Sequence, residues 1–172
     1  KMGINGNSGD KGHSNSLYSE IEDINSLFHY YMDDIKNIKN IGSLVAYFDD
    51  DDKTDTKMAI LRAIVSQDTI KFDDKCNQLF LHRQDYYKYI LSNVSDSDAR
   101  KLLEKYINAK TIADVDENLS ITINRWIKKI QSEFDILKNK IYSMPGYAES
   151  VGKLKSLIPD KTGLFNDGID RD

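Results

Sequence analysis

Apolar residues recur along the chain in two long seams with helical spacing. The first seam consists of Leu17, Ile21, Ile24, Phe28, Tyr31, Ile35 and Ile38, with spacings that alternate between four and three residues. The second consists of Leu119, Ile123, Trp126, Ile130, Phe134, Leu137, Ile141 and Met144, with nearly the same alternation. Such spacing keeps one face of an α-helix apolar. The pattern therefore predicts two long helices, Leu17 to Ile38 and Leu119 to Met144, packed in one core.

Shorter apolar patterns with the same period predict further helices between and after the seams. These patterns cover residues 58–65, 72–91, 99–107 and 151–157. The stretch "SLVAYF", residues 43–48, is too short to assign by period, and it fits a helical turn, an apolar bridge or a strand.

Glycines and polar residues at the borders of these patterns indicate where helices begin and end. Gly42 marks the predicted end of the first long helix, and Pro145 with Gly146 marks that of the second. The candidate N-caps are Asn15 or Ser16 for the first long helix, Asp52, Thr54 or Asp55 for the helix near residue 58, and Ser95, in a capping box with Asp98, for the helix near residue 99.

The predicted fold is an all-α helical bundle with two long heptad-patterned helices and several shorter helices. A chain of 172 residues is long enough for one domain with a real core, and it contains only two prolines and nine glycines to interrupt helices. We expect residues 1–15 to form a flexible N-terminal tether, residues 16–158 the bundle domain, and residues 159–172 a polar C-terminal tail.

The charge and composition of the chain favour some classes of binding partner over others. The chain has 24 basic and 28 acidic residues and a net charge of −4, which opposes nucleic-acid binding and favours a partner with a cationic patch. No apolar run approaches the length of a transmembrane helix. The single cysteine, Cys76, lies among apolar residues at helical spacing, which indicates a buried, unreactive thiol. The three histidines lack the spacing of metal ligands, and the sequence predicts no metal site and no cofactor.

Clusters of tyrosine occur in the segments "HYYM" and "QDYYKYI". Such clusters can form recognition surfaces, because tyrosine combines a large apolar ring with a polar end. At helical spacing, however, Tyr31 and Tyr87 face inward with the apolar residues, and the other tyrosines lie at the rim of the core. We therefore interpret both clusters as parts of amphipathic helices.

The densest charge in the chain is an acidic run within "LVAYFDDDDKTDTK", residues 44–57. An EF-hand calcium loop counted from Asp49 would have Lys53 at a ligand position, Thr54 in place of the glycine and Ile60 in place of the final glutamate, so this interpretation fails. A solvated loop, whose last acidic residues cap the next helix and favour its positive end, fits the pattern better.

An enzymatic alternative rests on the same run. Asp50, Asp52 and Thr54 form the pattern D-x-D-x-T, which resembles the first motif of haloacid-dehalogenase-type phosphatases. The resemblance implies Asp50 as the nucleophile that attacks phosphorus and Asp52 as the general acid/base. That fold presents its nucleophile at the end of a strand in a parallel sheet, whereas the rest of this chain predicts helices.

The acidic run is also the leading candidate for a surface that binds a partner. Its candidate residues are Asp49, Asp50, Asp51, Asp52, Lys53 and Asp55, which we expect to form an exposed loop. The second candidate is the acidic turn with Ser95, Asp96 and Asp98, at a different helix junction. Acidic side chains on an exposed loop attract a basic partner and speed its association.

A polar tether, "NGNSGDKGHSNS", is followed by a helical segment, "SLYSEIEDINSLFHYYMDDIKNIKN". In this arrangement the chain resembles mature surface lipoproteins of Borrelia spirochaetes. Among these proteins, the chain is similar to the small factor H-binding lipoproteins of relapsing-fever species. The resemblance spans most of the chain and rests on composition and architecture, without a diagnostic motif.

The resemblance implies a non-enzymatic protein on the surface of a bacterial outer membrane. It implies capture of the host complement regulator factor H for immune evasion, and attachment to the membrane only through a lipid anchor on a cysteine before Lys1. It assigns no individual residue to the partner. A structural or assembly role for the helical bundle stays open as a further alternative.

Overall fold

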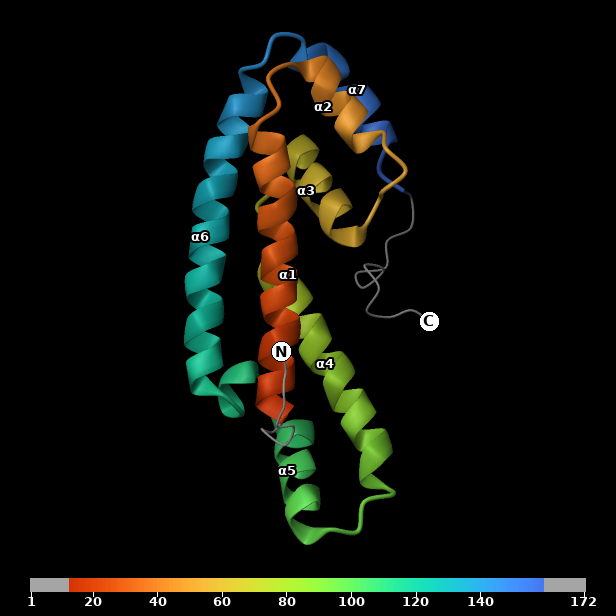
Figure 1. Ribbon diagram of the computed structural model, residues 1–172, viewed down its shortest axis with the longest axis vertical. Coiled ribbons are helices and arrows are strands. Elements are labelled where there is room, and N and C mark those ends of the chain that lie inside the picture. Colours follow the sequence, from red (N-terminus) through yellow and green to blue (C-terminus); the bar gives the residue numbers. More distant parts are fainter. Residues whose placement is uncertain (1–12, 160–172) are drawn as a thin grey trace. The chain divides into compact units, whose positions relative to one another are not determined.

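The apolar seams and the shorter apolar patterns form helices. The computed structural model describes residues 13–159, and over this range the chain has seven α-helices, one short 3-10 helix and no strand (Figure 1). Residues 1–12 of the predicted tether and residues 160–172 of the predicted tail lie outside the described residues. The all-α fold predicted from the sequence is confirmed.

The elements follow in the order α1 (His13–Lys36), α2 (Ile41–Phe48), α3 (Asp55–Ser66), α4 (Phe72–Leu91), α5 (Ser97–Asn108), η2 (Ile112–Asp114), α6 (Glu117–Tyr142) and α7 (Tyr147–Ser156). The two long helices α1 and α6 correspond to the two seams, and each ends two residues before its seam does. The predicted N-caps Asn15 and Ser16 are wrong, because α1 begins before them. Residues 43–48 belong to α2, which contradicts the strand alternative for this stretch.

Side-chain caps explain where the helices around the acidic run begin. The side chain of Asn40 accepts a hydrogen bond from the backbone N–H of Ser43 at 2.9 Å and starts α2. Gly42, predicted to end the first helix, therefore lies in the first turn of the next one. The hydroxyl of Thr54 accepts a hydrogen bond from the N–H of Lys57 at 3.2 Å, which confirms one of the three predicted caps of α3.

The cap of α5 differs from its prediction by one residue. The carboxylate of Asp96 accepts a hydrogen bond from the backbone N–H of Ala99 at 2.9 Å, so Asp96 is the N-cap. The predicted capping box of Ser95 with Asp98 is wrong. Two neighbouring residues of the type that caps helices precede α5, and the sequence alone does not rank them.

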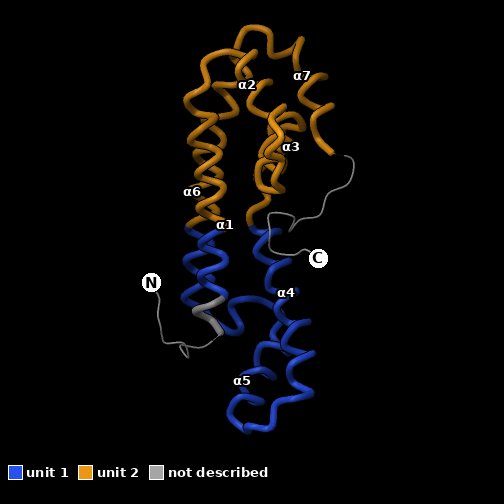
Figure 2. The backbone as a smooth tube through the Cα atoms, turned by 45° about the vertical axis from the view of Figure 1, so that its right-hand side comes forward, with its two compact units in different colours: residues 1–23, 73–125 blue, residues 24–72, 126–172 orange. Residues whose placement is uncertain are grey.

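The described chain divides into two compact units (Figure 2). Over the described residues, unit 1 comprises residues 13–23 and 73–125, and unit 2 comprises residues 24–72 and 126–159. Nearly all of α4, with α5 and η2, belongs to unit 1, whereas α2, α3 and α7 belong to unit 2. Each of the long helices α1 and α6 contributes its N-terminal part to unit 1 and its C-terminal part to unit 2.

Unit 2 is built from five helices around a buried apolar core. Within it α2, α3 and α7 contact one another, and α1 and α6 lie side by side (Figure 2). The core includes Ile24, Phe28, Ile35, Leu44, Phe48, Ile60, Leu61, Ile64, Ile130, Phe134, Ile141 and Leu154. Within this unit, the apolar residues predicted to face inward on α1 and α6 are thus buried, except for Trp126, which is half-buried.

Unit 1 buries the other ends of the same seams. Its core includes Leu17, Ile21, Leu79, Phe80, Tyr87, Leu103, Tyr106 and Leu119. The buried amide of Gln84 donates hydrogen bonds to the carbonyl oxygens of Tyr106 (2.8 Å) and Ala109 (2.6 Å) and thereby satisfies the end of α5. Cys76 is buried as predicted, and burial raises the pKa of its thiol to about 12.

Candidate functional site

The acidic run connects α2 to α3 in unit 2. The backbone N–H of Asp49 donates a hydrogen bond to the carbonyl of Val45 at 2.9 Å and ends α2. The five residues Asp49–Lys53, here named the acidic loop, are all exposed to solvent. Asp55 is half-buried in the first turn of α3, where its charge favours the positive end of the helix. The predicted exposed loop from Asp49 to Asp55 is therefore two residues shorter in the structure.

Hydrogen bonds hold the acidic loop in one conformation. The carboxylate of Asp50 accepts a hydrogen bond from the backbone N–H of Asp52 at 3.1 Å. The ammonium of Lys53 donates to the carbonyl of Phe48 at 2.7 Å, which satisfies one of the last carbonyls of α2. Lys53 thus turns its charge back onto its own backbone, and the outer surface of the loop is left to aspartate.

Tyrosine and threonine hydroxyls connect the acidic loop to α1. The hydroxyl of Tyr31 lies 3.5 Å from a carboxylate oxygen of Asp52, to which it donates. The hydroxyl of Thr54 donates to that of Tyr31 at 2.9 Å. Tyr31 is buried, as the helical spacing predicted, so its hydroxyl is a fixed support for the loop.

A pocket of about 300 Å³ lies beside the acidic loop. Its lining includes three tyrosines and three aspartates: Tyr30, Tyr31, Tyr47, Asp34, Asp50 and Asp52. Tyr47 donates a hydrogen bond from its hydroxyl to Asp34 at 3.2 Å. Burial, and then the negative charge of Asp34, raise the pKa of Tyr47 well above its usual range.

Lys57 supplies the positive charge in the pocket lining. Only 2% of the residue is exposed, and its ammonium lies 4.3 Å from the centre of the Tyr47 ring, a cation–π distance. Burial lowers the pKa of Lys57, and the nearby carboxylates of Asp52 and Asp50 partly oppose this effect. Because one ammonium faces three carboxylates, the pocket and the adjoining loop attract positively charged groups.

The second predicted surface lies in the other compact unit. Ser95, Asp96 and Asp98 are exposed at the beginning of α5 in unit 1, whereas the acidic loop belongs to unit 2. Asp96 is already used as the cap of α5, and Asp98 lies in the first turn of that helix. Local helix capping explains the acidic character of this turn, so the acidic loop is the stronger candidate.

The phosphatase alternative depended on a strand before Asp50. In the structure Asp50 and Asp52 follow α2, and residues 13–159 contain no strand that could present a nucleophile at the edge of a parallel sheet. Within the same range, no group of three or more histidine, cysteine, aspartate or glutamate side chains is placed to hold a metal ion.

Six residues of the pocket lining were not among the predicted site residues: Tyr30, Tyr31, Asp34, Ala46, Tyr47 and Lys57. Tyr30 and Asp34 are four residues apart on α1 and so share one face of that helix, a signal that could have paired them. Nothing in the local sequence indicates that Lys57 is buried, because a lysine in the first turns of a helix is usually solvated. Its burial results from packing between α3 and the Tyr47 ring of α2.

Comparisons with known proteins add no relative. No protein-family model, no curated protein and no solved structure matches the chain. In the part of the chain that the structure describes, no helix has both the length and the apolar character needed to cross a membrane.

Proposed function

We propose that the protein is a non-enzymatic binding module that captures a basic surface of a protein partner through the acidic loop. The observation that carries this proposal is the set of four consecutive exposed aspartates, Asp49 to Asp52, beside a pocket lined by tyrosine and aspartate. Charges in this exposed position act mainly on the rate of association and on the choice of partner.

The tyrosines beside the loop support the same proposal. Tyr30 is 61% exposed, and it lines the pocket together with Tyr47. Tyrosine rings contribute large contact areas at protein interfaces and pack against arginine and lysine side chains. A basic partner would therefore find both carboxylates for long-range attraction and aromatic rings for close contact.

The proposed partner is the host complement regulator factor H. This choice comes from the resemblance of the tether and the first helix to surface lipoproteins of Borrelia, and a basic patch on the partner would complement the acidic loop. The protein would then lie on the outer membrane of the bacterium, held by a lipid anchor, and factor H bound there would reduce complement attack on the cell.

A pull-down from human serum tests the partner and the loop together. We expect the immobilised protein to retain factor H, and a variant with Asn at positions 49, 50, 51 and 52 to retain much less. If no factor H is retained, the proposed partner is wrong. If the variant retains as much factor H as the wild type, the partner stands and the acidic loop is not the surface that binds it.

A further inference from the structure

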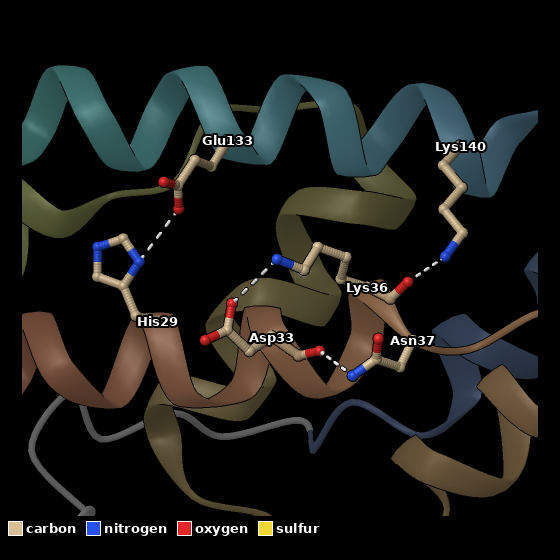
Figure 3. A network of polar contacts seen from close by, with 6 residues as sticks. All are labelled: His29, Asp33, Lys36, Asn37, Glu133 and Lys140. Carbon is tan, nitrogen blue, oxygen red and sulfur yellow. Dashed lines mark hydrogen bonds and ion pairs between the residues drawn. The ribbon is translucent and has the colours of Figure 1, made fainter.

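A second surface of unit 2 combines an apolar pocket with charged edges. The pocket, of about 230 Å³, is lined by residues of α1 and α6. Figure 3 shows the polar contacts between these two helices. The apolar lining of the pocket consists of Met32 and Leu137, both buried, and Ile136, which is 70% exposed. Single exposed apolar side chains are common on protein surfaces, so Ile136 alone indicates nothing. Its position beside a pocket with an ordered set of charges is what distinguishes it.

The charges around this pocket are ordered along both helices. Figure 3 shows α1 and α6 running in the same direction past the pocket. On α1 the acidic Asp33 precedes the basic Lys36, and on α6 the acidic Glu133 precedes the basic Lys140. Ile136 lies about 4.5 Å beyond Glu133 and about 6 Å before Lys140 along the helix axis. The surface thus has an acidic end at Glu133 and a basic end at Lys36 and Lys140. Ile136 and Asp33 lie between these ends.

Contacts within the chain hold these charges only weakly. The ammonium of Lys36 lies 3.7 Å from the carboxylate of Asp33, and both side chains are more than two-thirds exposed. A ring nitrogen of His29 lies 3.2 Å from the carboxylate of Glu133, and Lys140 donates to the backbone carbonyl of Lys36 (Figure 3). An exposed ion pair contributes little free energy, so Lys36 and Asp33 can exchange partners at little cost.

We propose that this surface binds a second copy of the chain, with the helices of the two copies antiparallel and a two-fold axis close to Ile136. A rotation of 180° about an axis perpendicular to α6 places Glu133 of each copy opposite Lys140 of the other. On α1 the same rotation leaves Asp33 close to the axis and brings Lys36 of each copy to the end of the other copy that carries Glu133. The two Ile136 side chains meet at the centre and cover the apolar linings.

The order of charges is the reason for choosing a second copy over another partner. A partner with a uniformly basic or uniformly acidic surface would leave one end of this surface facing like charge, which is unfavourable. A surface that is acidic at one end and basic at the other is complementary to itself under a two-fold rotation, as the interface of a symmetric dimer must be. Such a dimer would present two acidic loops, which goes beyond the function proposed above.

Sedimentation equilibrium of the complete chain, from micromolar to millimolar concentration, tests this proposal. We expect the average mass to rise with concentration from the 19.7 kDa of the monomer toward twice that value. Ile136→Ser should raise the dissociation constant of the dimer about tenfold. Ile121→Ser, which changes a 49% exposed isoleucine of the same helix outside this pocket, is the matched control and should leave the constant unchanged.

Charge reversal identifies the antiparallel arrangement. Glu133→Lys and Lys140→Glu should each weaken the dimer about tenfold or more, the double variant should associate as well as the wild type, and a mixture of the two single variants should form heterodimers. Thermal melting verifies that each variant is folded. A chain that stays monomeric at all concentrations, or a double variant no better than the single ones, would overturn the proposal and leave the pocket to a different partner.

Discussion

At the scale of single residues, Lys57 is a buried positive charge beside the acidic loop. Its ammonium is removed from water and is held beside Tyr47, with Asp50 and Asp52 nearby. Removing a charge from water costs free energy, and carboxylates that are themselves exposed return only part of it. Lys57 therefore reduces the negative charge of the site without contributing much to folding.

The first prediction replaces this lysine by an apolar residue of similar length. Lys57→Met should leave the free energy of unfolding unchanged or raise it by about 1 kcal/mol, because the cost of burying the ammonium is removed. Urea unfolding measures the change, with Lys71→Met at an exposed lysine of unit 2 as the control. A loss of stability well beyond that of the control would show that Lys57 is a structural counter-ion of the loop.

The turn between α6 and α7 requires a residue without a side chain at Gly146. Its φ angle is 88°, and an added Cβ would lie 3.3 Å from a methyl carbon of Ile41. Gly146→Ala should lower the free energy of unfolding by about 1–2 kcal/mol, since the left-handed conformation is unfavourable for other residues.

Gly152 in α7 is the matched control for this second prediction. A Cβ at Gly152 meets nothing within 4 Å, so Gly152→Ala should stabilise the protein by about 0.5–1 kcal/mol through its higher helix propensity. Thermal or urea unfolding of the two variants gives both values. Changes of the same sign in the two variants would contradict the proposed role of Gly146.

At the scale of elements, the long helices were predictable and the short ones were less so. The seams identified α1 and α6 because a repeated apolar spacing records which face of a helix is buried over many turns. The eight residues of α2 and the three residues of η2 are too short to show a period. Helix starts were predicted only in part: Thr54 was one of three candidate caps for α3, and Ser95 was predicted where Asp96 caps α5.

The candidate site was predictable to a similar extent. The run of aspartates is local and visible in the sequence, and so is the inward orientation of Tyr31. The pocket is formed where α1 meets the segments on both sides of the acidic loop, so the contribution of Tyr30 and Asp34 depends on tertiary contacts. Sequence spacing within one helix carries no information about such contacts.

The third prediction concerns η2, whose capping box depends on Asp114. A carboxylate oxygen of Asp114 accepts hydrogen bonds from the N–H groups of Lys110 (2.9 Å) and Thr111 (3.0 Å), and these bonds lower the pKa of the carboxyl below its usual value. A lowered pKa in the folded state gives stability that is present above the unfolded pKa of about 3.9 and lost as the pH falls through the folded pKa.

Asp114→Asn should therefore be less stable than the wild type at neutral pH by a constant amount. The difference should shrink once the pH falls below about 4 and become small when Asp114 of the wild type is protonated. Urea unfolding of both proteins between pH 7 and pH 2 measures it. A difference that does not depend on pH would show that the charge of Asp114 has no part in holding η2.

At the scale of the whole chain, α1 and α6 each contribute to both compact units. The buried apolar face of α6 therefore supports much of the structure. The fourth prediction tests this face at Ile130, which is 0% exposed in unit 2. Ile130→Asp buries a charge without a partner and should cost several kcal/mol, about the whole stability of a domain of this size. The helical circular dichroism signal and the cooperative melting transition should be lost.

Ile136→Asp on the same helix is the matched control for folding. Because Ile136 is 70% exposed in the single chain, this variant should keep its helical signal and, at concentrations where the protein is monomeric, melt at nearly the wild-type temperature. If Ile130→Asp also melted like the wild type, the seam of α6 would not be buried in unit 2.

The central claim is that the acidic loop captures a basic partner by electrostatic attraction. Its most direct test is the rate of association with factor H at several salt concentrations, for the wild type and for the variant with Asn at positions 49, 50, 51 and 52. The matched control removes the same amount of charge elsewhere, by amide substitution of four exposed acidic residues in unit 1: Glu22, Asp23, Asp85 and Glu104.

The account predicts that the loop variant associates at least about tenfold more slowly at low salt, and that its rate depends much less on salt than that of the wild type. The control variant should lose less of the rate, although its net charge is the same. Equal association rates and equal salt dependence for the wild type and the loop variant would contradict the account.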